Sequence, residues 1–284
     1  MSIIRDATIK VKEGELENDD ILLFVGPRQA GKTTILKQLK DYLEKRNDVC
    51  YFLNLEDPEY LELLNQSPKN LFKIFSIDLN KRNFVFIDEV QYLKNPSNFL
   101  KYLYDEYKNK IKLLVSGSSA FYLDKKFKDS LAGRKKIFNV LTLSFREFLR
   151  FKNEIELSQK DFYNLGLSEK EKIITYYDEF MIYGGYPRVA LAPLEEKEEL
   201  LREIAYSYIK KDIYEANIKQ DEIFYKLLKI LSSQVGGLVN SSELAATLGI
   251  SKTAIDNYLY IMQKSFHLVL IKPFFKNIRK ELTK

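Results

Sequence analysis

Short apolar runs separated by amphipathic stretches dominate the first half of the chain. Five runs have the length and composition of buried strands: residues 21–25, 49–55, 84–90, 111–119 and 135–143. After the first run, apolar residues recur at Ile35, Leu36, Leu39 and Leu43, which is the spacing of a helix packed on one face. Nearly all-apolar strands that alternate with helices predict an α/β fold with a parallel sheet covered on both faces.

The pattern becomes helical from Ser144 onward. Residues 144–151, 169–185 and 194–215 have helical periodicity, with a polar segment before the second helix and the turn "GGYPR" before the third. We therefore expect a helical region over residues 144–218, beside a sheet domain that comprises residues 1–143.

A third pattern begins at about residue 219. A helix over residues 222–234 is followed by "GGLVN" and then by a helix that ends at Leu248, with Ser241 or Ser242 as its cap. Ser251 caps the next helix after the tight turn "LGIS", and an apolar β-run follows that helix. This order predicts a helix-turn-helix with a wing, a winged-helix domain over residues 219–284. The second helix buries one face, formed by Ile255, Tyr258, Leu259 and Met262, and leaves another exposed, formed by Lys252, Thr253, Asp256, Asn257, Tyr260 and Gln263.

Composition excludes several classes of protein. A single cysteine, Cys50, excludes an internal disulfide framework. A single histidine, His267, lies in an apolar run and argues against a zinc site or a Ser/His hydrolase; we expect it to be a strand residue. No apolar run has the roughly 18 residues of a membrane span, and the N-terminus lacks a signal-peptide core, so we expect a cytoplasmic protein without a membrane partner. The net charge of +5 does not by itself imply nucleic acid.

The segment "GPRQAGKTT" matches the phosphate-loop pattern G-x-x-x-x-G-K-[ST] between a predicted strand and a predicted helix. Its glycines let backbone N–H groups face a phosphate, Lys32 supplies a charge to the β- and γ-phosphates, and Thr33 can ligate Mg²⁺. We expect ATP and Mg²⁺ as cofactors. The expected nucleotide contacts are Gly26, Pro27, Arg28, Gln29, Ala30, Gly31, Lys32, Thr33 and Thr34.

Two adjacent carboxylates, Asp88 and Glu89, follow the third apolar run. If residues 84–87 form the strand beside the phosphate-loop strand, Asp88 emerges at its C-terminal end and can hold the hydration shell of Mg²⁺. Glu89 then points elsewhere and can polarise a water in line with the γ-phosphate. A solvated strand end is the alternative interpretation. A glutamate after the aspartate favours hydrolysis, and a phosphoryl-transfer kinase remains the alternative reaction.

Further polar residues lie where they can contact a nucleotide. Ser116 and Ser118 follow the fourth run, and Ser118 is the candidate for the γ-phosphate or the attacking water; a serine-rich turn is the alternative. Arg28, Arg134 and Arg188 closely follow glycines, and a guanidinium on such a loop suits a bidentate phosphate contact. We take Arg134 of "LAGR" as the catalytic candidate, with an ordinary surface arginine as the alternative.

These motifs together with "FIDEVQYL", "SGSSAFYL…LAGR", "LSFREFL", "GGYPRV", "YIKKDI" and "KPFFKNIRKELTK" resemble the prokaryotic AAA-type ATPases of archaea and bacteria. The resemblance covers nearly the whole chain. It implies an AAA-like P-loop NTPase core of the ASCE type that binds and hydrolyses ATP, followed by a helical region and a winged helix. Such proteins usually continue into a restriction-endonuclease-like domain; that domain is absent here, so we expect a truncated chain or a split gene and carry over no nuclease chemistry.

Three functional hypotheses follow. The first is an ATPase switch whose winged helix contacts DNA or a protein partner, the second a regulatory module that holds ATP with little turnover, and the third a kinase. Residues 272–284 hold five basic residues against Glu281, which favours double-stranded DNA as a partner through the winged helix and this tail. A protein partner or a homo-oligomer remains the alternative.

Overall fold

The structure, a computed structural model, describes residues 3–117, 131–215, 218 and 220–271. The chain divides into two compact units, Met1–Tyr208 and Ile209–Lys284. The long helix α11 (Leu194–Glu215) includes residues of both units.

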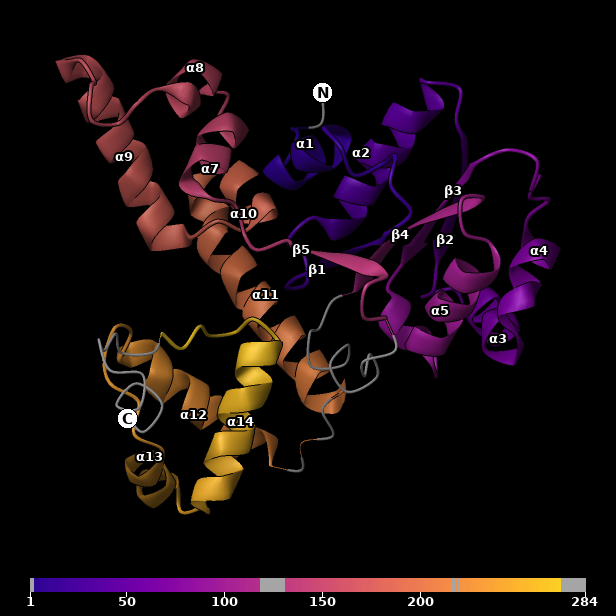
Figure 1. The fold of residues 1–284 in the computed structure, drawn as a ribbon. Helices are drawn as coiled ribbons and strands as arrows, with labels where there is room; N and C mark the ends of the chain where they lie inside the picture. The colour runs from indigo at the N-terminus through magenta and orange to yellow at the C-terminus, as the bar shows by residue number, and fades with distance from the viewer. Residues whose placement is uncertain (1–2, 118–130, 216–217, 219, 272–284) are drawn as a thin grey trace, which may run out of the picture. The chain divides into compact units, whose positions relative to one another are not determined.

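Within the described residues, the five predicted strands form one parallel sheet (Figure 1). The strands are β1 (Ile21–Val25), β2 (Val49–Asn54), β3 (Asn83–Asp88), β4 (Ile111–Gly117) and β5 (Lys135–Asn139). Their order across the sheet is β2-β3-β4-β1-β5. The predicted α/β class and its five-stranded parallel core are confirmed.

The strand between β3 and the phosphate-loop strand β1 is β4, so the condition that β3 lies beside β1 is not met. The register nevertheless brings the strand ends level. Val25 at the end of β1 pairs with Gly117 of β4, and Ile87 of β3 pairs with Val115 of the same strand. Asp88 therefore emerges at the edge where the phosphate loop begins, although a whole strand separates them.

Helices cover both faces of the sheet. The chain moves from β1 to β2 in one direction across the sheet and from β3 to β4 in the other, so right-handed crossovers fall on opposite faces. Accordingly α2 (Lys32–Glu44) lies on one face, and α3 (Pro58–Gln66) and α5 (Pro96–Glu106) lie on the other (Figure 1).

The first unit contains further helical segments. They are α1 (Asp6–Lys12), η1 (Pro68–Asn70), α4 (Leu71–Ile74), η2 (Val90–Tyr92), α7 (Phe145–Phe151), α8 (Ile155–Gln159), α9 (Leu167–Tyr183) and α10 (Pro187–Leu191). The predicted helices at α7, α9 and α11 are confirmed. Helices α1, α8 and α10 were not predicted, because these short helices lie outside the segments with recognisable helical periodicity. No helix in the described ranges is both long and apolar enough to cross a bilayer.

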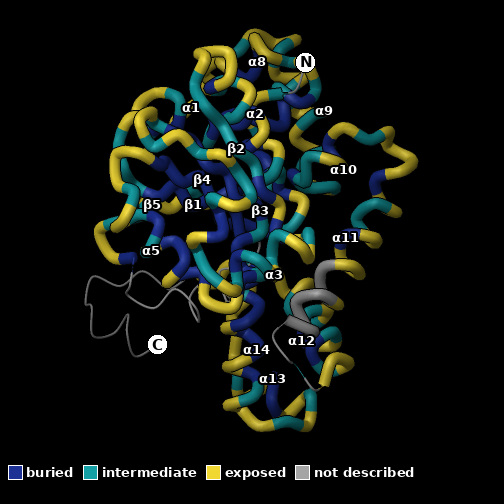
Figure 2. Tube along the Cα trace, turned by 90° about the vertical axis from the view of Figure 1, so that its right-hand side faces the viewer, coloured by how far each residue is buried: buried dark blue, intermediate teal, exposed yellow. Residues whose placement is uncertain are grey.

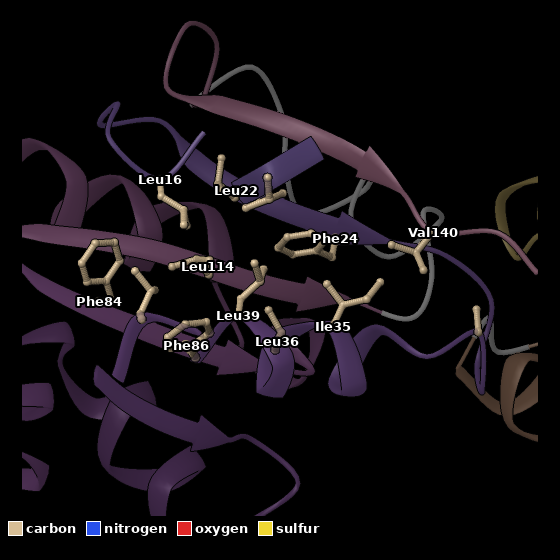
Figure 3. Packing of buried hydrophobic residues seen from close by; sticks show 13 residues of the cluster. Leu16, Leu22, Phe24, Ile35, Leu36, Leu39, Phe84, Phe86, Leu114 and Val140 are labelled. Carbon is tan, nitrogen blue, oxygen red and sulfur yellow. The ribbon is translucent and has the colours of Figure 1, made fainter. Parts of the chain in front are cut away.

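The main core joins α2 to the sheet. Figure 3 shows Ile35, Leu36 and Leu39 of α2 among Phe24 of β1 and Phe86 of β3, all of them fully buried. Burying a Leu, Ile or Phe side chain stabilises a fold by about 1.5–3 kcal/mol. This face of α2 therefore anchors the helix that begins at the end of the phosphate loop.

The two edge strands differ from the expectation of a sheet covered on both faces. In Figure 2 the inner strands β1, β3 and β4 are buried, whereas β2 is half-buried. Strand β5 contains exposed residues, among them Ile137. An edge strand has a neighbour on one side only. The predicted strand over residues 135–143 was also too long, because β5 ends at Asn139, and β3 ends at Asp88 rather than residue 90.

The second unit contains α12 (Asp221–Ser233), α13 (Ser241–Leu248) and α14 (Lys252–Lys264). The helix-turn-helix of α13 and α14 appears as predicted, with Gly249 in the left-handed region at the turn and Ser251 capping α14. The predicted cap of α13 was wrong by one residue, because the Asn240 side chain accepts from the N–H groups of Ser242 and Glu243 at 3.0 and 3.4 Å.

The faces of α14 agree with the prediction. Its buried face consists of Ile255, Tyr258, Leu259 and Met262, together with Ile261. Its exposed residues include Lys252, Thr253, Asp256, Asn257 and Tyr260, while Gln263 is half-buried. Residues 265–271, which were predicted to begin the wing, form no strand, and His267 is thus not a strand residue. The rest of the predicted wing and the basic tail lie outside the described residues.

Gly26→Ala is expected to destabilise the fold. A Cβ at this position lies 1.9 Å from the carbonyl oxygen of Val140 and 2.7 Å from its carbon, and neither is a side-chain atom that can turn aside. We expect the free energy of unfolding in denaturant to fall by about 1–3 kcal/mol or more. Gly14→Ala is the matched control, because nothing lies within 4 Å of its Cβ position. Equal stability of the two variants would contradict the prediction.

Candidate functional site

The loop between β1 and α2 has the backbone of an anion site. Gln29 has φ 55° and Gly31 has φ 94°, so left-handed residues interrupt the chain just before α2 begins. Such alternation turns successive N–H groups toward one side, where they form a concave site for an anion. The 13-residue helix α2 adds its positive N-terminal end.

Lys32, the first residue of α2, lies folded against this loop. Its side chain is buried, and Nζ donates to the carbonyl oxygens of Gly26 and Pro27 at 2.9 and 2.7 Å. The loop therefore holds the ammonium charge close to its own backbone. This places a cation where a phosphate would enter.

Asp88 meets two hydroxyl groups from two different elements. Thr33 Oγ1 of α2 donates to Asp88 Oδ2 at 2.7 Å, and Ser116 Oγ of β4 donates to Asp88 Oδ1. Burial raises the pKa of Asp88, and the hydrogen bonds from Ser116 and Thr33 oppose that rise. A buried carboxylate beside a threonine hydroxyl fits Mg²⁺, which binds proteins through one or two carboxylates and completes its shell with water and phosphate oxygens.

Glu89 is turned away from its neighbour. Its backbone is left-handed, with φ 57° and ψ 47°, so the chain leaves β3 at a sharp bend and enters η2. The Glu89 N–H donates to Ser116 Oγ at 3.0 Å, while Gln91 Nε2 donates to the Glu89 carboxylate. The two adjacent carboxylates thus have different partners: hydroxyl groups for Asp88 and an amide for Glu89.

Ser116 is the serine that the structure brings to this site. It is fully buried and touches both acidic residues, donating to Asp88 and accepting from the Glu89 N–H. Ser118, the serine selected from the sequence as catalytic, lies outside the described residues. The signal for Ser116 is its position as a polar residue at the end of an otherwise apolar parallel strand.

Arg134 is not brought to this edge of the sheet. It comes directly before β5, and its carbonyl accepts from the N–H of Ile21, the first residue of β1. Strands β1 and β5 are parallel, so Arg134 lies at their starting edge, opposite the phosphate loop. There its Nε donates to Asp105 Oδ1 at 2.7 Å.

The remaining predicted residues differ in placement. Gln29 and Thr34 are exposed, Pro27 and Ala30 are buried, and Arg28 is half-buried in the loop. Arg188 of "GGYPR" pairs with Glu203 at 3.2 Å on an exposed surface.

Three residues at the site were missed by the sequence analysis. Gln91 contacts Glu89, and Arg5 and Glu147 form a buried ion pair of 2.7 Å behind the phosphate loop. Arg5 stands in an N-terminal segment without a motif, and Glu147 looks like an ordinary helix-capping residue. No local pattern could have linked them.

Comparisons of the sequence with known proteins give two family matches. Residues 18–149 match the AAA domain, and residues 174–284 match a domain of unknown function. An uncharacterized protein of Methanocaldococcus jannaschii is 29% identical over 96% of this chain and 60% of its own. An uncharacterized protein of Haemophilus influenzae is 28% identical over 91% of this chain and 64% of its own. The chain therefore spans about three fifths of the length of these relatives.

Solved structures give a more distant likeness. The ADP form of the Aeropyrum pernix ORC2 protein is 13% identical, with a TM-score of 0.45 over 93% of this chain and 86% of its own. AMPPCP-bound DnaA from Aquifex aeolicus is 16% identical, with a TM-score of 0.40 over 94% of this chain and 91% of its own.

Ser116→Ala is expected to lower the free energy of unfolding by about 1–3 kcal/mol at neutral pH, because the charged Asp88 loses a donor. Burial holds the pKa of Asp88 above its ordinary value. Ionisation of Asp88 therefore destabilises the fold as the pH rises from the ordinary pKa through the raised one, and below the raised pKa the group is neutral. The stability lost in Ser116→Ala should therefore be smaller in acid, where it comes only from the hydrogen bond that the Glu89 N–H no longer makes.

Urea unfolding at neutral and acidic pH measures this effect. Asp88→Asn provides the control background, since Ser116→Ala should have a smaller effect where residue 88 carries no charge. If Ser116→Ala destabilises the chain that retains Asp88 equally at neutral and acidic pH, the assigned role of Ser116 is contradicted.

Proposed function

We propose that this chain, which belongs to the AAA-type P-loop ATPase family, binds ATP with Mg²⁺ and hydrolyses it to ADP and phosphate at the edge of its parallel sheet. The observation that carries the proposal is the 2.7 Å hydrogen bond from Thr33 Oγ1 to Asp88 Oδ2. It joins the start of α2, directly after the phosphate loop, to the strand end that supplies the carboxylates. Lys32 and Glu89 lie at the same edge.

Each residue has a distinct task in the proposed reaction. A water attacks the γ-phosphorus, the bond from that phosphorus to the β,γ-bridging oxygen breaks, and ADP leaves with the electron pair. Glu89 orients the water and accepts its proton. Lys32 and the N–H groups of the loop offset the negative charge of the phosphate oxygens. Thr33 and Asp88 are the residues that would hold Mg²⁺, which neutralises phosphate charge when bound.

The proposal includes two further catalytic residues, Ser118 and Arg134, for which the structure describes no contact with the phosphate loop or the acidic pair. Ser118 is proposed to touch the γ-phosphate or the water. Because Arg134 lies at the opposite edge of its own sheet, its proposed phosphate contact would be to the nucleotide of a neighbouring copy in a homo-oligomer.

A partner-binding role is proposed for the second unit, as the winged-helix part of a three-part chain with boundaries at residues 143 and 218. The exposed face of α14 carries Lys252, Thr253 and Asn257, side chains that can contact phosphates and base edges. Asp256 and Tyr260 on the same face leave its charge mixed. We favour double-stranded DNA as the partner, with a protein contact as the alternative.

A second candidate function, a slow regulatory ATP-binding module, is favoured by one observation. The proposed base Glu89 accepts a hydrogen bond from the buried Gln91 amide. A carboxylate engaged in this way must exchange that bond, or share it, to take a proton from water. Turnover of the purified chain separates the two candidates.

Glu89→Gln is expected to bind MgATP as tightly as the wild type and to lose about 10²–10⁴-fold in turnover, because the amide cannot accept the proton of the attacking water. Phosphate release and calorimetric titration with nucleotide measure the two effects separately. Lys32→Met is the contrasting variant and should lose nucleotide affinity itself. Unchanged turnover in Glu89→Gln would remove Glu89 from the mechanism.

Duplex DNA binding is expected to be tight at low salt and to weaken as salt rises, because lysines displace counterions from phosphates. Fluorescence anisotropy of a labelled duplex measures it. Lys252→Ala on α14 should weaken binding and reduce the salt slope by about one. Lys229→Ala removes the same charge from an exposed position on α12 and serves as control. Absence of binding at low salt would favour the protein contact.

A further inference from the structure

A buried arginine lies behind the phosphate loop. Arg5 immediately precedes α1, is 5% exposed, and reaches three separate segments of the chain. Its Nη1 donates to the carbonyl of Ala30 in the phosphate loop, and its Nη2 donates to the carbonyl of Leu141 at 2.9 Å. Its Nε and Nη2 donate to Glu147 of α7 at 2.7 and 3.3 Å.

The carboxylate of Glu147 is itself held on all sides. Besides the forked contact with Arg5, it accepts from the N–H groups of Asp6 at 2.9 Å and Ser144 at 3.0 Å. Burial raises the pKa of Glu147, but the hydrogen bonds from Arg5, Ser144 and Asp6 outweigh burial, so the pKa lies below its ordinary value. The pair is therefore charged at neutral pH and fixed in geometry.

The contact with Ala30 orients a peptide of the phosphate loop. The described chain contains no cis peptide bond, so the C=O of Ala30 and the N–H of Gly31 point in opposite directions. Because Arg5 holds the carbonyl on one side, the Gly31 N–H must face the other. That N–H lies directly before Lys32 and α2, among the donors of the proposed anion site.

The helical region approaches the same peptide from a second direction. A Cβ on Gly31 would lie 3.6 Å from Arg5 Nη1 and 4.0 Å from Cγ of Pro187, the first residue of α10. A hydrogen bond joins the segments that precede these helices: the N–H of Leu143, before α7, donates to the carbonyl of Gly185, before α10, at 2.7 Å. The phosphate loop thus lies close to α10 and is linked through Arg5 to α7, and the hydrogen bond between Leu143 and Gly185 joins the segments before these two helices.

We propose that Arg5 is a positioning residue for the phosphate loop, and that its pairing with Glu147 makes the anion-binding geometry of the loop depend on the position of α7. The inference rests on the proposed nucleotide site and adds a route by which that site is coupled to the helical region. Binding of phosphate that requires the oriented Gly31 N–H then stabilises the contact with α7, and displacement of α7 weakens phosphate binding by the same factor.

Packing alone does not explain this pair. A buried ion pair is weak evidence for stability, since well-packed apolar residues of similar volume often stabilise a fold as well or better. What an apolar pair cannot do is hold the carbonyls of Ala30 and Leu141 and a helix at once. A planar guanidinium with five donors in fixed directions does so, and a lysine does not.

Arg5→Lys in the full chain tests the proposal, because it keeps the charge and loses the fork. Arg150→Lys is the matched control: Arg150 of α7 pairs with Asp6 of α1, so it joins the same two helices without touching the loop. We expect Arg5→Lys to raise the Kd for MgADP about 10-fold, within the usual range of coupling between sites. Arg150→Lys should change it less than about twofold, as for other partly exposed ion pairs.

Hydrogen exchange provides the readout that a merely structural role would not move. In the wild type, MgADP should slow amide exchange in α7; in Arg5→Lys, saturating MgADP should leave α7 exchange unchanged. Slowed exchange that persists in Arg5→Lys, or a Kd equal to that of Arg150→Lys, overturns the proposal while the ATPase function stands. A wild type that binds neither MgADP nor MgATP overturns both.

Glu147→Gln keeps the inference testable if Arg5→Lys fails to fold. Glutamine retains the capping box with Ser144, so α7 keeps its start, while the charge that holds Arg5 is lost. By itself it should raise the Kd for MgADP above that of Arg150→Lys, and an equal Kd would overturn the proposal. Where Arg5→Lys does fold, the double variant should bind MgADP no more weakly than the weaker-binding single variant. Additive losses would show that the two residues act separately and would overturn the pairing.

Discussion

The contact between Thr33 and Asp88 is the constraint on which the rest of the site depends. It spans from the first turn of α2 to the end of β3, past the intervening strand β4. It forms only because the parallel strands end level, and they end level because their buried side chains hold one register. Packing of α2 on the sheet places the hydroxyl at the same height. A hydrophobic core thereby sets the geometry of two small polar groups.

The phosphate loop is constrained by a backbone carbonyl at one end and by a buried arginine side chain near the other. On one side the Val140 carbonyl passes so close to Gly26 that a side chain has no room there, and the Val140 N–H donates to Val25 at 2.7 Å. On the other, Arg5 binds the carbonyl of Ala30. Both constraints come from residues distant in sequence: Arg5 lies 25 residues before Ala30, and Val140 follows the fifth strand of the sheet. The loop is shaped by its surroundings as much as by its own glycines.

Adjacent carboxylates at one strand end take separate directions because the strand stops between them. Asp88 is the last residue of β3, extended and buried, whereas Glu89 adopts a left-handed conformation that a non-glycine residue rarely takes. Such local strain persists where surrounding contacts maintain it, here the Ser116 hydroxyl and the Gln91 amide. The bend separates a site suited to a cation from one suited to a water.

Local pattern was enough to establish the strands, the phosphate loop, the acidic pair and the two helices of the helix-turn-helix, since each depends on spacing and turn chemistry within a few residues. Sheet order, the role of Ser116 and the Arg5–Glu147 pair were decided only by the tertiary structure. Parallel strands pair across long connections, and nothing local specifies which strand lies between two others. Whether a residue precedes or follows its strand then decides which edge it reaches, and that is why Asp88 lies at the site and Arg134 does not.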